Sequence, residues 1–411
     1  MAVNQADQPG APERDEKSAV PQGQHVSRRG ILKGFGTGIL TVVVVGTGAV
    51  AFKGSREQVL DYSAGHAYDP WKDWQDSPGP LGMVAAAILS ANPHNTQPWI
   101  FRVSSDRIEL YADPSRATGA LDALGREQMV GLGAALENLI LAAGPRGYAT
   151  TVTLLPDSNA AHVATIGLHR SGQKQASALY RAIGDRHSNR GPYQPAPVAA
   201  QAIARLTAQA SDLPGLELRW FTTPPERAAL GALMIDAAQA IVNDQGQSVD
   251  GFAWFRASEA AIEKHRDGLT DWGQDLSDLI TSAAVLLPAS SRTAGDQFWL
   301  TQTKTVHTKT AAAYGVITVR DPGDALTRLR GGQLIERLHL SATVQGLGFQ
   351  HMNQITERID REASLGQPPA FSDRFDALLD SPGRTALVSF RIGHPVRPGR
   401  LSPRRPVSWV S

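Results

Sequence analysis

The chain of 411 residues contains no cysteine, which excludes disulfide bonds, thiolate metal ligands and a cysteine nucleophile. It also lacks an excess of charge of either sign, because it has 40 basic and 39 acidic residues and a formal net charge of +1. This balance, with only short basic runs, argues against nucleic acid as a partner. The dinucleotide-binding, P-loop, zinc-protease and serine-hydrolase signatures are absent, and no His cluster has metal-ligand spacing, so we expect no metal.

The N-terminal region has the features of an export signal. The pair Arg28-Arg29 precedes an apolar, glycine-rich run, which is typical of a twin-arginine signal, and Ala-Val-Ala at 49–51 offers a cleavage site. The apolar core at 39–52 has 14 residues, fewer than the ~20 of a membrane span, although an uncleaved anchor stays an alternative. We therefore expect 1–52 to be a signal region read by the twin-arginine translocase, and the protein to be exported to the periplasm or cell envelope.

The next part of the chain predicts a linker and a first α+β half. Residues 53–78 read as a linker with aromatic anchors, ending in turn residues. Apolar periodicity and alternation then predict a first half at 79–172, with helices at 81–89 and 127–143 and strands at 100–103, 107–113 and 149–155.

A repeat links this half to the later part of the chain. At an offset of 199, GAALENLILAAGPRG (133–147) and GQLIERLHLSATVQG (332–346) are identical at six of fifteen positions. Both segments end in glycine and precede a strand-like run. Two unrelated amphipathic helices would share Leu and Ala, but matched flanking glycines favour an internal duplication.

The second half is predicted at 173–411, and its globular part opens near Ala176. Helices are expected at 198–210 and 225–242, and strands at 216–223, 314–321 and the last apolar run, 386–393. Residues 244–300 form an irregular, Trp-bearing insert, and long inserts of this kind often act as lids or binding elements. Asp360 and Glu362 are expected on a helix surface. The predicted fold class is α+β, with two sheet-and-helix halves fused head to tail.

Two polar segments are candidate binding elements. The loop SANPHNTQPW (90–99) offers amide and imidazole groups between two prolines, which suits a planar heterocycle, although an Asx-rich turn would satisfy only its own backbone. The run RHSNR (186–190) has the chemistry of a phosphate clamp, although a solvated basic turn is the commoner outcome. The arginines of the Pro-rich tail could complete the clamp or belong to a basic terminus: Arg397, Arg400, Arg404 and Arg405.

Together, the motifs resemble a known family. SANPHNTQPWIF, RHSNRGPY and RTALVSFRIGHPVRPGR resemble motifs of flavin-dependent nitroreductases, and YADPSRATGALDALGREQMVGLGAALENL resembles the Acg-like branch, whose members are internally duplicated nitroreductase folds with FMN. The resemblance covers about residues 79–411. It implies an FMN-dependent oxidoreductase that takes electrons from a small-molecule donor and reduces nitroaromatic or quinone-like acceptors.

The resemblance also implies how the site is assembled. In ordinary nitroreductases two subunits share each FMN site; here only the first half has the Asn-x-Gln-Pro-Trp loop, and only the second has RHSNR and the basic tail. The second half instead carries AWFRASEAAIEK where we expected its own loop. We therefore expect a monomer that acts as a pseudo-dimer with one FMN.

Carried over residue by residue, the resemblance implies eleven cofactor-binding residues. Arg186, Ser188 and Arg190 would hold the phosphate and ribityl end with Arg400 or Arg404, while Pro93, His94, Asn95, Gln97, Met352 and Asn353 would approach the ring. No side chain is expected to be catalytic in its own right, because the flavin does the chemistry.

Position 94 departs from the family pattern, because His94 stands where the family usually keeps a small hydroxyl residue. This bulkier group puts ordinary substrate access in doubt. Two alternatives to an enzyme therefore stay open: a protein that binds or sequesters FMN without turnover, and an exported interaction module that has lost the flavin. The presence of both RHSNR and NPHNTQ argues against the second.

Overall fold

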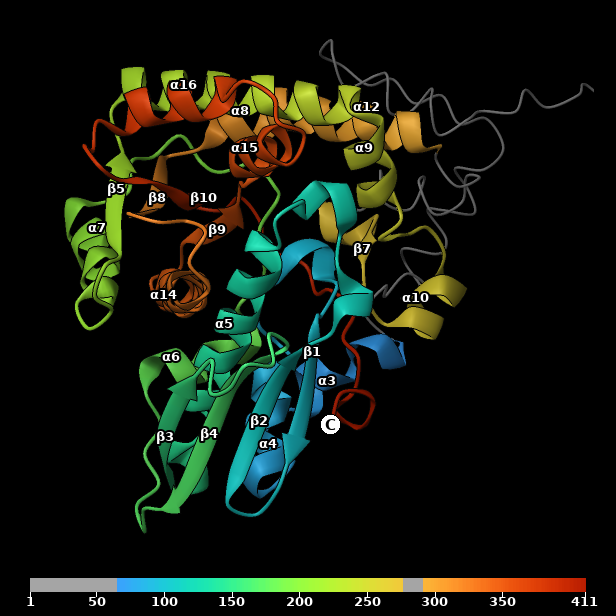
Figure 1. Cartoon of the computed structure of the whole chain (residues 1–411), viewed down its shortest axis with the longest axis vertical. Coiled ribbons are helices and arrows are strands. Elements are labelled where there is room, and N and C mark those ends of the chain that lie inside the picture. Colours follow the sequence, from blue (N-terminus) through green and yellow to red (C-terminus); the bar gives the residue numbers. More distant parts are fainter. Residues whose placement is uncertain (1–64, 276–290) are drawn as a thin grey trace, which may run out of the picture.

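The computed structural model describes residues 65–275 and 291–411 (Figure 1). The Arg28-Arg29 pair and the apolar run after it lie outside the described residues, so the signal and its cleavage stay predictions. Within the described ranges, no helix combines the length and the apolar character needed to cross a membrane.

The first half is built on a four-stranded antiparallel sheet of order β1-β2-β4-β3. Its strands are β1 (Trp99–Val103), β2 (Arg107–Ala112), β3 (Tyr148–Leu154) and β4 (His162–Arg170), and its helices are α3 (Asp69–Asp73), α4 (Gly79–Ala87) and α5 (Arg126–Leu141). In β1, Trp99 and Phe101 are buried while Ile100 and Arg102 are exposed, the alternation of a sheet with one covered face. The predicted helices and strands of this half are present, with ends shifted by a few residues.

The second half is a four-stranded antiparallel sheet of order β5-β8-β10-β9. Its strands are β5 (Glu217–Phe221), β8 (Ala313–Val319), β9 (Gly348–His351) and β10 (Thr385–Gly393), and its helices are α6 (Ala178–Arg181), α7 (Ala200–Thr207), α8 (Pro224–Asn243), α13 (Thr308–Thr310), α14 (Ala325–Val344), α15 (Gln354–Ser364) and α16 (Ala370–Leu379). β8 is buried along its whole length, because α8 and α16 lie on one side of the sheet and α14 on the other (Figure 1). This explains its continuous apolar run.

The two sheets have the same topology. The repeated helix, α5 or α14, follows the second strand of its sheet and precedes the outer strand, and the strand orders correspond position by position. The α+β class and the internal duplication predicted from the sequence are therefore confirmed. The topology corrects one expectation: the counterpart of the 90–99 loop is the segment before β5, and AWFRASEAAIEK belongs to the insert after α8.

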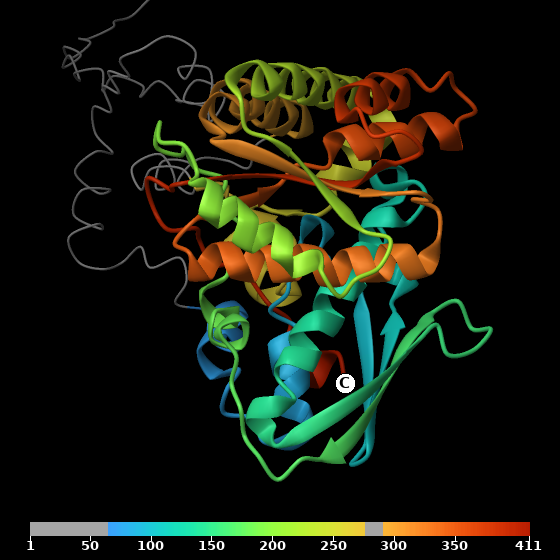
Figure 2. The same cartoon turned by 90° about the vertical axis from the view of Figure 1, so that its left-hand side faces the viewer.

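The halves meet where α5 and α14 cross (Figure 2). A Cβ on Gly133 would overlap the carbonyl oxygen of Leu329, and a Cβ on Gly332 would overlap that of Val130. Both partner positions are again 199 residues apart, so the contact is reciprocal, as a two-fold relation between the halves requires. The paired glycines let the two backbones touch.

Three segments join the first half from outside its predicted limits. Residues predicted as linker form α3, and Trp71 and Trp74 are buried in the core of the first half. Tyr180 of α6 packs into the same core. The C-terminal segment returns to this half, where Val410 O accepts a hydrogen bond of 2.6 Å from Phe101 N. The boundaries of the halves in space thus differ from those in the sequence.

The insert, predicted as irregular, contains regular elements in its described part. These are α9 (Gln245–Phe252), β6 (Phe255–Arg256), α10 (Glu259–His265), β7 (Leu269–Thr270) and α12 (Arg292–Gln302). Asp244 caps α9 by accepting hydrogen bonds from Gly246 N and Gln247 N, and it also pairs with Arg361 of α15. This carboxylate fastens the insert to the second half.

Asp360 and Glu362, predicted on a helix surface, are instead buried on α15, at 3% and 6% exposure. Asp360 forms an ion pair with Arg126 of α5, and Glu362 Oε2 accepts a hydrogen bond of 3.2 Å from Phe371 N. The prediction was wrong because α15 is packed against α8 and α16. Its acids also find partners, including Arg126 of α5, that sequence spacing does not reveal.

Candidate functional site

A cavity of about 310 Å³ lies between the two halves and the insert. The 91–94 loop and the start of α5 contribute from the first half. The second half contributes the β9–α15 junction, Ser188 and Arg190, and the insert adds residues of α9 and α12. Because no part of the chain encloses this space alone, it is a site of the pseudo-dimer as a whole.

Six of the eleven predicted cofactor residues line this cavity. They are Pro93, His94, Ser188, Arg190, Met352 and Asn353. The backbone of Met352 is held by β10, since its N–H donates to Ser389 O at 2.8 Å, and Asn353 Oδ1 accepts from Ser389 N at 3.0 Å. The other five predicted residues, Asn95, Gln97, Arg186, Arg400 and Arg404, do not line it.

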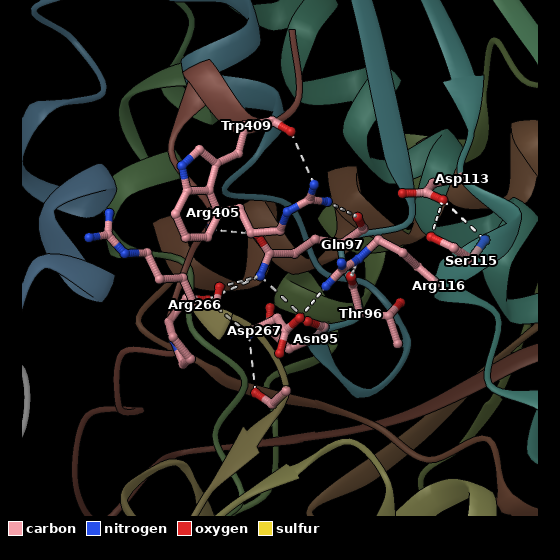
Figure 3. Close-up of polar contacts among 12 residues, drawn as sticks. Asn95, Thr96, Gln97, Asp113, Ser115, Arg116, Arg266, Asp267, Arg405 and Trp409 are labelled. Atoms are coloured by element: carbon pink, nitrogen blue, oxygen red, sulfur yellow. Dashed lines mark hydrogen bonds and ion pairs between the residues drawn. The ribbon is translucent and has the colours of Figure 1, made fainter. Parts of the chain in front are cut away.

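Asn95 and Gln97 do not line the cavity. They join the loop to the insert and the tail (Figure 3). The Asn95 amide donates to Gly268 O at 3.2 Å and to Pro403 O at 2.8 Å. The Gln97 amide donates to Arg266 O at 2.8 Å and accepts from Arg405 N at 2.8 Å. The two amides satisfy backbone groups of two segments, 266–268 and 403–405, that are distant from the loop and from each other in the sequence.

Arg116 also contributes to this junction between the loop and the insert (Figure 3). Arg116 donates to Thr96 O and pairs with Asp267 of the insert, whose other oxygen lies 2.7 Å from Arg256 Nη2. The insert is thus attached to the first half by polar contacts at residues 266–268, immediately before β7.

The loop itself has an uncommon backbone. His94, Asn95 and Gln97 have positive φ angles of 46°, 54° and 53°, in the left-handed region that disfavours side chains with a Cβ. Asn92 Oδ1 accepts from Gln97 N at 2.8 Å and closes the loop. This conformation leaves His94 at the cavity and directs the two amides to the insert and the tail, so neighbouring residues of one loop serve different surfaces.

Arg186, the first arginine of RHSNR, is committed to the protein interior. Its Nε lies 3.2 Å from Glu336 Oε1, and its Nη2 donates to Leu89 O at 2.8 Å. Nη1 lies 3.2 Å from His339 Nδ1. The guanidinium therefore fixes the loop and α14 rather than facing the cavity.

The two tail arginines also have protein partners. Arg404 is buried and donates to Asn95 Oδ1 at 2.6 Å and to Ser90 O at 3.2 Å. The Arg400 guanidinium lies 3.9 Å from the centre of the Trp272 ring.

Arg190 is the arginine of the motif that lines the cavity. Its Nη1 donates to Gly273 O at 2.9 Å, and its backbone N–H donates to Asp275 Oδ2. Asp275 Oδ1 accepts from Arg400 N at 3.1 Å. A carboxylate of the insert thus joins the motif to the tail just outside the cavity.

Three imidazoles of the cavity wall are neutral near pH 7. Burial, and then the charge of Arg190, lowers the pKa of His94 to about 4. Burial lowers the pKa of His351 to about 3, and that of His307 falls well below its usual value for the same reason. Within the described structure, His351 Nε2 is buried without a hydrogen-bond partner. These rings offer polar atoms to a ligand without adding charge.

The sequence interpretation missed two acidic residues of the wall and the aromatic residues of the insert. Glu127 and Glu357 line the cavity from the first turns of α5 and α15, and Phe252, Phe298 and Trp299 line it from the insert. The aromatic residues of the insert could have been found from the sequence, because the insert was already predicted to be Trp-bearing and a lid or binding element. Nothing in the spacing of two glutamates 230 residues apart indicated that they meet.

The comparisons with known proteins agree with the resemblance. No family model matches the chain. It is 28% identical over 273 residues to a Mycobacterium tuberculosis protein named "Putative NAD(P)H nitroreductase", covering 64% of this chain and 73% of the relative. It is 24% identical over 337 residues to "Putative NAD(P)H nitroreductase acg" of the same species, covering 80% and 93%. The chain therefore has homologues that bear nitroreductase names, including acg.

Solved structures of nitroreductases show a low level of structural similarity to this chain. NfrA2 of Bacillus megaterium has a TM-score of 0.33 at 13% identity, with 57% of this chain and 73% of that chain covered. The FMN-dependent nitroreductase NfnB of Mycobacterium smegmatis has a TM-score of 0.31 at 14% identity, with 55% and 94% covered.

Proposed function

We propose that this protein is an oxidoreductase of nitroreductase type that binds one FMN in the cavity between its halves. The single observation that carries the proposal is the joint lining of that cavity by Pro93 and His94, Ser188 and Arg190, and Met352 and Asn353. The first two pairs come from two motifs that resemble the family, the third follows the second repeated helix, and all three border one space. The names of the curated relatives support the same reading.

The residues present fit the cofactor. The unpartnered Nε2 of His351, the neutral His94 ring and the apolar side chains of the insert suit a planar heterocycle with polar edges. Arg190 and Ser188 offer charged and hydroxyl donors for a phosphate or ribityl chain. Arg186 and Arg404 would act indirectly, by holding the loop that carries His94.

Bound FMN would supply hydride or electron transfer to a nitroaromatic or quinone-like acceptor, with a nicotinamide as donor, as the relatives' names indicate. The chain's own residues would position the ring and exclude water. Asn353 is fixed by β10 at the cavity wall, and Phe252 and Trp299 cover the space from the insert. His94 narrows access where a small residue would leave room.

A second candidate function is FMN binding without turnover. The observation that favours it is the insert, whose aromatic side chains form one wall of the cavity. Its backbone is fastened by Asn95 and Gln97, and its Asp267 side chain pairs with Arg116. A wall held in this way would limit access of acceptors. We also propose export by the twin-arginine pathway, because that route carries proteins that have already folded around a cofactor. Few nicotinamides are expected outside the cytoplasm, so export would favour binding without turnover.

The test is the flavin content of the purified full chain, followed by its reactivity. We expect a yellow protein with one FMN per chain that behaves as a monomer in sedimentation. A colourless protein that cannot be reconstituted would refute the flavin assignment, and two FMN per chain would refute the single shared site. After reduction with dithionite, reoxidation by a quinone or nitroaromatic supports the enzyme, while its failure supports sequestration.

A further inference from the structure

Two glutamates meet at one wall of the cavity. Glu127 lies in the first turn of α5, and Glu357 lies in the first turn of α15, four residues after Asn353. Both side chains line the cavity, and they are hydrogen-bonded to each other, with Asn353 also bonded to Glu127. Glu127 lies within the segment that resembles the Acg-like branch, and Glu357 lies outside the quoted motifs, but the resemblance assigns a role to neither residue.

The cations near this pair are committed to other groups. Arg126 forms an ion pair with Asp360, and Arg358 donates to Asp244 Oδ2 at 3.1 Å. Arg328 donates to the carbonyl oxygens of Pro322 and Leu124. The two glutamates therefore have no cation of their own among the described residues.

The contact between the two carboxyl groups favours a shared proton. Glu127 is 8% exposed, and its Oε1 is buried and receives no hydrogen bond from an N–H or hydroxyl group of the described residues. Two buried carboxylates in contact repel each other if both are ionised, so one of them holds a proton that bonds the other. Burial, and then the charges of Glu357 and Asp122, raises the pKa of Glu127 well above its usual range. Burial raises the pKa of Glu357 to about 8.

We propose that the Glu127–Glu357 pair is the proton donor for the acceptor in the cavity: a carboxylic acid that hydrogen-bonds a quinone or nitro oxygen and transfers its proton to it. This inference rests on the proposed function, because the electrons come from reduced FMN. The pair lies beside Met352 and Asn353, the residues expected at the reactive edge of the flavin.

The step balances for a quinone. The acceptor gains a hydride, which carries two electrons and one proton, and its other oxygen must gain one further proton to give the hydroquinone. The O–H bond of the carboxylic acid breaks, a new O–H bond forms on the quinone oxygen, and the pair is left with two carboxylates. Their repulsion favours recovery of a proton from water before the next turnover.

Other charged groups around the pair set the pH range in which it acts. Asp122 is held by the backbone N–H groups of Glu127 and Gln128 at 3.1 and 2.8 Å. The further groups on the packed elements and across the cavity are Asp360, Arg126, Arg328, Arg358, Asp244, His94, Arg190, Asp271 and Asp296.

The test compares the flavin-loaded wild type with E357Q and E127Q. Protein reduced with dithionite is mixed with a benzoquinone, and flavin reoxidation is followed from pH 6 to pH 9. In the wild type we expect the rate to fall about tenfold between pH 7 and pH 9, as the acid loses its proton. In E357Q we expect the rate at pH 6.5 to drop on the order of 100-fold and the fall with pH to disappear.

The matched control is E362Q on the same helix, whose amide oxygen can still accept from Phe371 N. It should keep the wild-type rate and pH profile. The infrared carbonyl band of a carboxylic acid at pH 6.5, present in the wild type and lost in the E127Q/E357Q double variant, reports the shared proton independently of turnover. A flavin-loaded E357Q with the wild-type profile overturns this proposal alone, whereas a protein that binds no flavin overturns the proposed function as well.

Discussion

Arg186 Nε lies 3.2 Å from Glu336 Oε1, and the side chains are 2% and 0% exposed. The pair joins the start of RHSNR to the repeated helix α14, and Glu336 Oε2 also accepts from Ala91 N at 3.3 Å. One buried ion pair thus fixes the two motifs that the resemblance assigns to opposite halves. Arg186 contributes to the site by holding its walls together.

Replacing one member of this pair should destabilise the fold. R186M leaves Glu336 buried without its cation, and breaking a buried ion pair costs about 3–5 kcal/mol. Chemical denaturation of the wild type and the variant measures the loss. The matched control is R374M, which removes the exposed pair of Arg374 with Asp236 and should change stability by only about 0–1 kcal/mol. Equal losses in the two variants would contradict the structural role of Arg186.

Arg190 should affect flavin binding more than stability, because its side chain lines the cavity. Charge-assisted hydrogen bonds contribute roughly 1.5–3 kcal/mol, so R190A should weaken FMN binding by about 10- to 150-fold. Fluorescence titration of the apoprotein with FMN gives the dissociation constants. R205A, on the exposed surface of α7, serves as the control, and an R190A affinity equal to that of R205A would remove Arg190 from the site.

The amides of the loop should control attachment of the insert and the tail (Figure 3). Q97A leaves Arg266 O and Arg405 N without their side-chain partner, and an unpaired buried group costs about 1–3 kcal/mol. We expect faster limited proteolysis within the insert and the C-terminal segment in Q97A. N159A, in an exposed turn, should be cleaved at the wild-type rate, and an unchanged pattern in Q97A would contradict the role of Gln97.

The sequence predicted those elements whose formation depends on local pattern. The helices near 81–89 and 127–143 and the strands of both halves follow from apolar periodicity, and the repeat followed from fifteen aligned positions. The course of the chain between the halves could not be predicted. The return of Val410 to β1 and the burial of Trp71 depend on packing against surfaces formed hundreds of residues away.

For the site, the motifs predicted which segments meet but not which way each side chain points. His94, Asn95 and Gln97 all have positive φ angles, and only the backbone decides which of them faces the cavity. Arg186 and Arg190 are four residues apart and differ in the same way: Glu336 of α14 binds the first, and the cavity borders the second.

The crossing of α5 and α14 should not tolerate a methyl group. In G332A the new Cβ would overlap Val130 O. No side-chain rotation can relieve this overlap, because the obstructing atom belongs to the backbone. Overpacking of this kind typically costs about 1–3 kcal/mol, measured by thermal or chemical denaturation. G295A is the control: it is also inside a helix, but its Cβ would lie 3.6 Å from the Phe252 ring, an ordinary contact. It should be neutral or stabilise by up to about 1 kcal/mol, and equal effects of the two changes would contradict the close crossing.

Neutral His94 should make the fold sensitive to acid. Its pKa is about 4 in the fold, below the usual value of 6.5, so the unfolded chain takes up the proton first as the pH falls. The stability contributed by neutral His94 is complete above about pH 6.5 and is lost between pH 6.5 and 4, at about 1.4 kcal/mol per pH unit. H94N removes this titration and places at φ 46° a residue that accepts the left-handed region more readily. Free energies of unfolding at pH 7, 6, 5 and 4.5 should therefore fall less steeply in H94N than in the wild type. The control H265N changes an exposed histidine and should keep the wild-type slope. If the H94N slope equalled the wild-type slope, His94 would be protonated at the same pH in the folded and the unfolded chain.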